Sequence, residues 1–342
     1  MIHLSNRTRR RSAAAGTATA VAAAGLLLAA CSAGAGAAAP GASTSAAAPS
    51  ASPSTSATKL AVVPLLPLTG QPAASAAALT RPIVVVDVTF TGNGAGIRGV
   101  GQADLIYQEF PNPGVSRLVA GFQSQDAPSV GPVAATSPMD VRVVDLWALP
   151  VLAFNGGPTG FVKQVGPTVV TPRSTTSFAA LFHLDGSSFY ASTSTLRASA
   201  PGASPAPQGL LSFGGPTAKS GAGAHPVTHL SVTVPGQPRQ NWSFNGTGWV
   251  GPGGVAVTNL VVQTVSYKTL TSAKSPTVHT AVLIGTGPAT VIGGGYAVSC
   301  TWIRAQPLKI TNYFDSKSLS IALTPGRTWI ILVPAGTAVS TS

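Results

Sequence analysis

From residue 227 to the end, the chain is a succession of short runs rich in β-branched and aromatic residues, separated by turns rich in glycine and proline. Runs of about four to eight such residues, bounded by turn residues, are typical of β-strands. The runs cover residues 230–234, 240–244, 255–267, 280–284, 296–304, 310–314, 319–323 and 328–333. They predict an all-β domain, sandwich-like or barrel-like, over residues 227–342.

The preceding region, residues 81–197, mixes two patterns. Strands are expected at residues 83–88, 105–110, 115–123 and 151–154, and short helices at residues 141–147, 160–165 and 177–182. This mixture predicts a mixed α/β N-terminal domain, so that the fold class of the whole chain would be α+β. Residues 198–226 are rich in Pro, Gly, Ala and Ser, which indicates an interdomain linker.

The N-terminus has the pattern of an export signal. Four arginines between Arg7 and Arg11 precede an apolar run that ends in Leu28-Ala29-Ala30-Cys31. A basic segment, an apolar segment and small residues before a cysteine predict a lipoprotein signal peptide over residues 1–30 and lipid attachment at Cys31. A transmembrane helix is a weaker alternative because the run is mostly alanine. Ordinary cleaved secretion is a second alternative, and the export route stays open.

After the signal, residues 31–80 are dominated by Ala, Ser and Pro. Such a composition cannot bury enough apolar surface to offset the entropy lost on ordering, so we expect a disordered tether. Together with Cys31, the tether predicts a protein anchored by lipid to the outer face of the cytoplasmic membrane.

Charge limits the choice of partners. The chain has 20 Lys and Arg residues against 8 Asp and Glu residues, a net charge of +12. Its basic residues stand singly, whereas nucleic-acid-binding proteins usually cluster them on one helix or stripe. We therefore expect no nucleic-acid partner. Beside a membrane, a basic surface would attract anionic lipid or wall polymer; a basic protein without such a partner is an equally good alternative.

Two cysteines are present. If Cys31 carries lipid, Cys300 has no partner for a disulfide, and no cysteine metal site can form. Cys300 lies in a strand-like run and is expected to be a small buried residue. No sequence motif predicts a metal or a cofactor, so we expect none.

Several short motifs occur in a recognisable order. They are Arg81-Pro-Ile-Val-Val-Val-Asp87, Gln102-Ala-Asp-Leu-Ile-Tyr107, Gly114-Val-Ser-Arg117, Phe122-Gln-Ser124, Val130-Gly-Pro132, Asn241-Trp-Ser-Phe244, Asn259-Leu-Val-Val-Gln263 and Pro325-Gly-Arg-Thr-Trp329. In this order the chain resembles the YerB-like family of putative bacterial lipoproteins. The resemblance covers nearly everything from residue 81 to residue 334 and implies a two-domain architecture of unknown activity.

The chain also departs from that family. Relatives typically carry Asn where this chain has Val88, Glu where it has Gln108, and Arg-Ser-Ala-Arg where residues 134–137 are Ala-Ala-Thr-Ser. If the replaced groups form a polar site in relatives, this chain keeps the scaffold and loses much of the site.

The candidate residues of a ligand-binding or polar site are Asp87, Asp104, Gln108, Glu109 and Arg117. With a four-residue loop at 111–114, Gln108 would lie opposite Arg117 on a two-stranded hairpin. A slip of one residue would pair Glu109 with Arg117 instead. We hypothesise the first register, which leaves the chain without an acid for catalysis.

Two functions follow from these observations. The first is a non-catalytic binding or structural protein of the cell envelope, with a wall polymer, a glycan or an envelope protein as its partner. The second is an envelope hydrolase acting on wall material through Asp or Glu acid–base chemistry. Such hydrolysis needs two carboxyl groups facing each other across the bond that is cleaved. We favour the first function.

Overall fold

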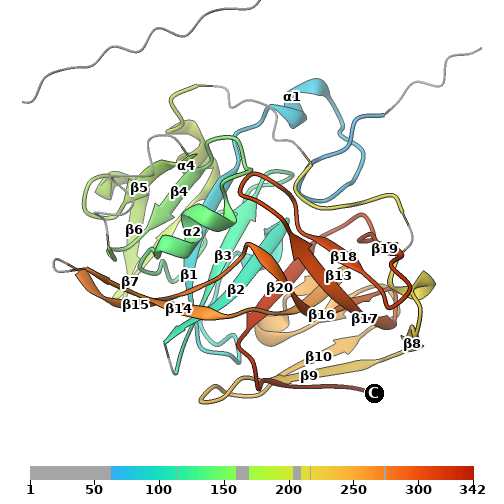
Figure 1. The fold of residues 1–342 in the computed structure, drawn as a ribbon. Helices are drawn as coiled ribbons and strands as arrows, with labels where there is room; N and C mark the ends of the chain where they lie inside the picture. Colours follow the sequence, from blue (N-terminus) through green and yellow to red (C-terminus); the bar gives the residue numbers. More distant parts are fainter. Residues whose placement is uncertain (1–62, 113, 159–168, 203–208, 216, 273–274) are drawn as a thin grey trace, which may run out of the picture. The chain divides into compact units, whose positions relative to one another are not determined.

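The computed structural model describes residues 63–342 apart from 113, 159–168, 203–208, 216 and 273–274. Its main element is a 12-stranded sheet (Figure 1). In spatial order its strands are β19 (Ser320–Ile321), β18 (Asn312–Phe314), β17 (Tyr296–Arg304), β16 (Gly285–Gly293), β13 (Asn259–Thr264), β20 (Thr328–Val333), β2 (Leu105–Asn112), β3 (Val115–Phe122), β1 (Val84–Phe90), β4 (Val151–Phe154) and β5 (Thr171–Ser174), with β8 (His225–Pro226) paired to β17.

Strand β20 joins the two halves of the sequence. It pairs in parallel with β2 on one side and with β13 on the other, and Ile330 lies opposite both Tyr107 and Val261. Strands from residues 81–197 and from residues 227–342 therefore belong to one sheet. The boundaries of the linker expected at residues 198–226 stay a prediction. In the structure, strands from the two sides of that segment pair with each other in the large sheet.

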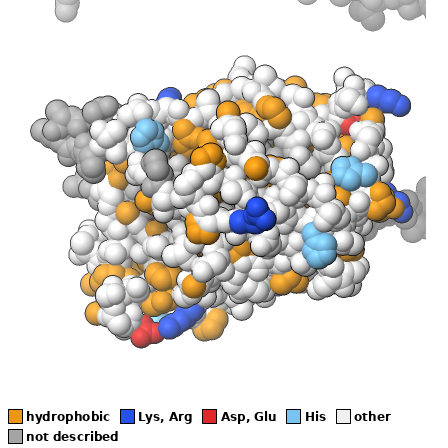
Figure 2. Space-filling model, turned by 90° about the horizontal axis from the view of Figure 1, so that it is seen from below, with side chains coloured by type: hydrophobic (Ala, Val, Ile, Leu, Met, Phe, Trp, Pro, Cys, Tyr) orange, Lys and Arg blue, Asp and Glu red, His pale blue; other side chains and the backbone are white. Residues whose placement is uncertain are grey.

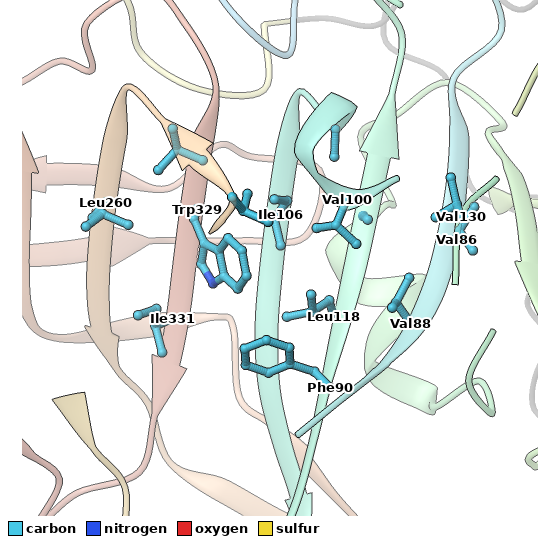
Figure 3. Packing of buried hydrophobic residues seen from close by; sticks show 14 of the residues in the cluster. Val86, Val88, Phe90, Val100, Ile106, Leu118, Val130, Leu260, Trp329 and Ile331 are labelled. Atoms are coloured by element: carbon cyan, nitrogen blue, oxygen red, sulfur yellow. The ribbon is translucent and has the colours of Figure 1, made fainter. Parts of the chain in front are cut away.

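A second, five-stranded sheet contributes to the same core. It consists of β12 (Ala256–Val257), β11 (Trp249–Val250), β10 (Gln240–Phe244), β9 (His229–Thr233) and β21 (Ala338–Thr341). From it, Trp242 packs edge-on against Trp329 of β20 with ring centroids 4.9 Å apart. Figure 3 shows Trp329 beside Ile106 and Ile331, with Phe90 and Leu118 nearby. This aromatic contact places residues of both sheets in one hydrophobic cluster.

The opposite face of the large sheet carries a second hydrophobic cluster. Val85, Leu105 and Ile330 alternate with the residues of the first cluster and are fully buried or nearly so. Every residue of β20 is buried. A strand covered on both faces is apolar throughout rather than alternating, which explains the continuous run Trp329-Ile-Ile-Leu-Val333.

In the part of the chain that the structure describes, helices are few and short. They are α1 (Ala76–Leu79), α2 (Pro138–Val143) and α4 (Thr193–Ala198), with the 3-10 helices η1 (Val100–Gln102), η2 (Ala179–Leu181), η3 (Ala218–Ser220) and η4 (Pro252–Gly254). Two further hairpins are β6 (Phe182–Asp185) with β7 (Ser188–Ala191), and β14 (Tyr267–Ser272) with β15 (Ser275–Ala281). The chain is thus mostly β. The expected mixed α/β N-terminal domain within an α+β fold is not confirmed.

The expected helices illustrate the difference. The helix expected at 141–147 begins earlier, at Pro138, because Ser137 caps it and a proline is favoured in the first turn. It ends at Val143. The helix expected at 177–182 is only the 3-10 turn η2. The helix expected at 160–165 lies outside the described residues. No helix in the described ranges has the length and apolar character needed to cross a membrane.

Residues 63–80, which composition assigned to the tether, belong instead to the folded part. Leu68 has no exposed surface and lies in the second hydrophobic cluster. The backbone carbonyl of Thr69 accepts a hydrogen bond from Gly326. The predicted signal peptide at 1–30, Cys31 and the tether up to residue 62 lie outside the described residues.

Candidate functional site

The hairpin β2–β3 has the register that the sequence analysis rejected. Glu109 lies opposite Arg117, and Gln108 lies opposite Leu118. The reason is local: Asn112 pairs with Val115, and a bulge between Glu109 and Asn112 places one extra residue in β2. With Asn112 opposite Val115, the turn is two residues shorter than expected, which alone would place Phe110 opposite Arg117; the extra residue at the bulge moves the register back by one, to Glu109. The hypothesis of a Gln108–Arg117 pair is therefore wrong. Glu109, not Gln108, shares a face with Arg117.

Gln108 has a structural place on the other face of the sheet. Its side-chain carbonyl accepts a hydrogen bond from the indole N–H of Trp329 at 3.1 Å, and its amide donates to the hydroxyl of Ser116 at 3.1 Å. Because Trp329 comes from β20, this amide ties the N-terminal hairpin to the central strand. The residue is fully buried and away from the acidic groups.

Arg117 gathers three carboxyl groups around one guanidinium. Its Nε lies 2.5 Å from Oε1 of Glu109, and its Nη2 lies 3.4 Å from Oδ1 of Asp87 and forms a closer ion pair with Asp140. Its Nη1 donates to the backbone carbonyl of Ala135. The arginine side chain is 6% exposed and the three carboxyl groups are not exposed at all. We call Asp87, Glu109, Asp140 and Arg117 the acidic cluster.

Sequence reasoning identified three members of the acidic cluster and missed Asp140. This residue lies in the first turn of α2, where one carboxylate oxygen accepts hydrogen bonds from the backbone N–H of Ser137 at 2.5 Å and the hydroxyl of Thr136 at 2.8 Å. Together with Ser137 it forms a capping box. The sequence signal that could have pointed to Asp140 was therefore Ser137-Pro-Met-Asp140. It predicts a helix start at Ser137, although not that the acid would reach Arg117.

Burial dominates the electrostatics of the acidic cluster. It raises the pKa of Asp87 well above its usual range, and the Asp140 carboxylate adds to that rise. Burial also raises the pKa of Glu109 to about 8, against the opposing effect of Arg117. Burial alone would lower the pKa of Arg117, but the three carboxyl groups outweigh it and raise that pKa. The guanidinium therefore stays charged, and Glu109 is largely protonated at neutral pH, while Asp87 holds its proton more tightly than an exposed aspartate does.

A cavity of about 360 Å³ adjoins the acidic cluster. Of the four cluster members only Arg117 lines it, together with polar residues such as Thr89, Asn112 and Ser137. The guanidinium thus separates the carboxyl groups from the cavity. A ligand in this cavity would meet an arginine already engaged by three acids, not an exposed acid or base.

Asp104 lies elsewhere. It precedes the first residue of β2, whereas Glu109 is in the second half of that strand. Its carboxylate accepts hydrogen bonds from the backbone N–H groups of Gln123 at 2.6 Å and Ser124 at 2.7 Å, and from the Ser124 hydroxyl. Burial nevertheless raises the pKa of Asp104. It lines a separate cavity of about 510 Å³ with Arg327, so the structure does not bring Asp104 together with the acidic cluster.

Cys300 is buried, as expected, and burial raises the pKa of its thiol to about 11. Among the described residues no group of three His, Cys, Asp or Glu side chains is arranged to hold a metal ion. In the acidic cluster, the position that a cation would need is occupied by the guanidinium of Arg117.

The fold and the acidic cluster define a mostly β protein whose two sequence halves share one sheet around a buried arginine–carboxyl group. Residues 68–202 match the family model described as "Protein of unknown function (DUF3048) N-terminal domain", and residues 251–330 match the model of the C-terminal domain of the same family. These matches together cover more than half of the chain, which therefore belongs to this YerB-like family of unknown function.

A solved structure supports the same conclusion at the level of the fold. The chain is similar to the crystal structure of YerB protein from Bacillus subtilis, with a TM-score of 0.65 and 18% sequence identity. The similarity covers 81% of this chain and 99% of the other. No curated protein matches the sequence significantly. The family resemblance predicted from the ordered motifs is thus confirmed.

Proposed function

We propose that this chain is a lipid-anchored protein of the cell envelope, held at the outer face of the cytoplasmic membrane, whose folded part binds a ligand or partner without catalysing a reaction. The proposal of an anchor rests on the sequence: a basic segment and an apolar run precede Cys31, and a long segment rich in Ala, Ser and Pro follows it.

The observation that carries the non-catalytic role is the burial of the acidic cluster. Asp87, Glu109 and Asp140 have no exposed side-chain surface and surround Arg117. A hydrolase that uses paired carboxyl groups must place them on either side of the scissile bond. Here a guanidinium occupies the space between the carboxyl groups. This arrangement favours a structural role for the acids, and no observation on the described residues favours the hydrolase.

Replacing Cys31 by alanine tests the anchor. Attachment of a diacylglycerol requires the thiol of Cys31, so Cys31→Ala should move the protein out of the detergent-extractable membrane fraction or leave it as an uncleaved precursor. Mass spectrometry of the wild-type N-terminal peptide should show acyl chains, and the variant peptide should lack them. Cys300→Ala is the matched control and should remain lipidated. Wild-type protein without acyl mass would contradict the anchor.

Incubation with isolated wall material tests the absence of catalysis. We expect the purified protein to release no soluble fragments above the background without protein, because no acid of the cluster reaches the solvent. Release would be measured by chromatography of the supernatant. If fragments appear with the wild type and disappear with Glu109→Gln, the non-catalytic role is wrong and the hydrolase takes its place.

Charge dispersal fits a binding role that does not involve nucleic acid. On the face shown in Figure 2, basic side chains stand singly and acidic ones are fewer. Hydrophobic side chains on that face are scattered rather than gathered. This face therefore shows no broad charged surface, and we propose recognition through a defined cavity.

A further inference from the structure

A third cavity, which Arg117 does not line, lies between three elements. It has a volume of about 420 Å³ and is bounded by α2 and the residues after it, the hairpin β14–β15 and the end of β17. Figure 1 shows α2 beside this hairpin, and the two are in contact. Apolar side chains such as Leu270, Leu283 and Ile284 form much of its wall. We call this the hairpin cavity.

The charged groups of the hairpin cavity are unbalanced. Three basic residues line it, Arg142, Lys268 and Arg304, against one acid, Asp145. Arg142 and Lys268 are exposed. The guanidinium of Arg142 and the ammonium of Lys268 can therefore turn toward a ligand in the cavity. In a chain with so few charged residues, this concentration of positive charge beside an apolar wall is a specific feature.

Arg304 gives the hairpin cavity a fixed charge. Its side chain is 7% exposed, and its Nη2 contacts both carboxylate oxygens of Asp145, at 2.7 Å and 3.0 Å. Its Nε–H has no hydrogen-bond acceptor among the described residues. This nitrogen is enclosed by the protein, so a ligand in the cavity would interact with Arg304 through its charge and not through a hydrogen bond from Nε.

We propose that the hairpin cavity binds an organic anion: a phosphate or carboxylate group held by Arg142, Lys268 and Arg304, attached to a single apolar chain or ring that packs on the hydrophobic wall. The volume lies toward the small end of the range for ligand pockets, about 300–1,000 Å³, and so suits one chain better than a two-chain lipid. This assignment deepens the proposed binding role and rests on it, but is independent of the anchor.

Isothermal titration calorimetry with the purified full chain tests this assignment. The probe is octyl phosphate, and the comparison compounds are inorganic phosphate, octyltrimethylammonium and dioctanoyl phosphatidylglycerol. Octyl phosphate should bind at least about tenfold more tightly than each comparison compound, since only it combines one chain with an anion. Raising the salt concentration should weaken its binding, because the basic residues are partly exposed.

The double variant Arg142→Gln/Lys268→Gln should bind octyl phosphate about tenfold more weakly, since it loses charge-assisted contacts. Both residues are exposed, so its thermal unfolding should match the wild type. Arg239→Gln, an exposed arginine next to β10, is the matched control and should bind normally. Absence of octyl phosphate binding at millimolar concentration, or an unchanged dissociation constant in the double variant, would overturn the site. Tighter binding of the two-chain lipid would overturn the single-chain assignment. Neither result alters the tests of Cys31 or of wall hydrolysis.

Discussion

Arg117→Met should be among the most destabilising single substitutions in this protein, with a loss of about 3–5 kcal/mol in the free energy of unfolding. The arginine is the cation shared by Asp87, Glu109 and Asp140, all without exposed surface. Methionine keeps much of the volume but removes the cation from the buried cluster, so that carboxylate charge there has no counter-charge and the hydrogen bonds from the guanidinium are lost. Urea denaturation followed by tryptophan fluorescence would measure the loss.

The matched control for this substitution is Arg98→Met. Arg98 pairs with Asp185 at 2.6 Å, but both side chains are about half exposed, at 51% and 53%. Exposed pairs contribute little to stability, so no measurable change is expected. If Arg117→Met is too unstable at pH 8, the measurement at pH 5 remains informative, because protonation of the orphaned acids should restore part of the stability. An Arg117→Met protein as stable as Arg98→Met at both pH values would refute the central role of Arg117.

The protein should become less stable as the pH rises from 6 to 9. Glu109 has a pKa raised to about 8 in the folded chain, from an ordinary value of 4.5, so the folded state holds a proton that the unfolded state has lost. Stability gained in this way is present below pH 4.5 and is lost as the pH rises through 8. The loss attributable to this group between pH 6 and pH 9 is on the order of 2 kcal/mol.

Glu109→Gln separates this contribution from the rest. Glutamine keeps the shape of the side chain but does not titrate. Between pH 6 and pH 9 the melting temperature of the variant should therefore fall less steeply than that of the wild type. The pKa of Asp87 is also raised, and a residual slope from that carboxyl group is therefore expected. Asp185→Asn, at the exposed surface pair, should retain the wild-type slope. A slope as steep in Glu109→Gln as in the wild type would show that Glu109 is not the titrating group.

The sequence predicts strands well where a run is long and dominated by β-branched residues. The expected ranges 151–154, 240–244, 296–304 and 328–333 coincide with β4, β10, β17 and β20. Strand β16 was missed because it contains Gly285, Gly287 and Pro288, which have low strand propensity. Its conformation comes from pairing with β13 and β17, and such pairing is not encoded within the segment itself.

The candidate site was harder to predict for a related reason. Asp87, Glu109 and Arg117 were chosen as polar residues in otherwise apolar strands, and the structure brings them together. Which residue lies opposite Arg117 depended on both the length of the turn and a bulge beside it, and periodicity alone reveals neither. Asp140 stood outside the expected strands, and its contact with Arg117 spans 23 residues of sequence. Local patterns do not report contacts of that kind.

The position of β20 has a consequence for the order in which the molecule can assemble. This strand follows β2 by more than 200 residues in the sequence, yet it lies inside the sheet, with β2 and β13 on its two sides. During synthesis, β2 and β13 appear first, each with an edge that has no partner yet, and such edges attract wrong pairings. Closing the sheet requires the ends of a loop of more than 200 residues to meet, which slows folding. The N-terminal half thus completes its fold only after residues 328–333, more than 200 residues later in the sequence, have been made.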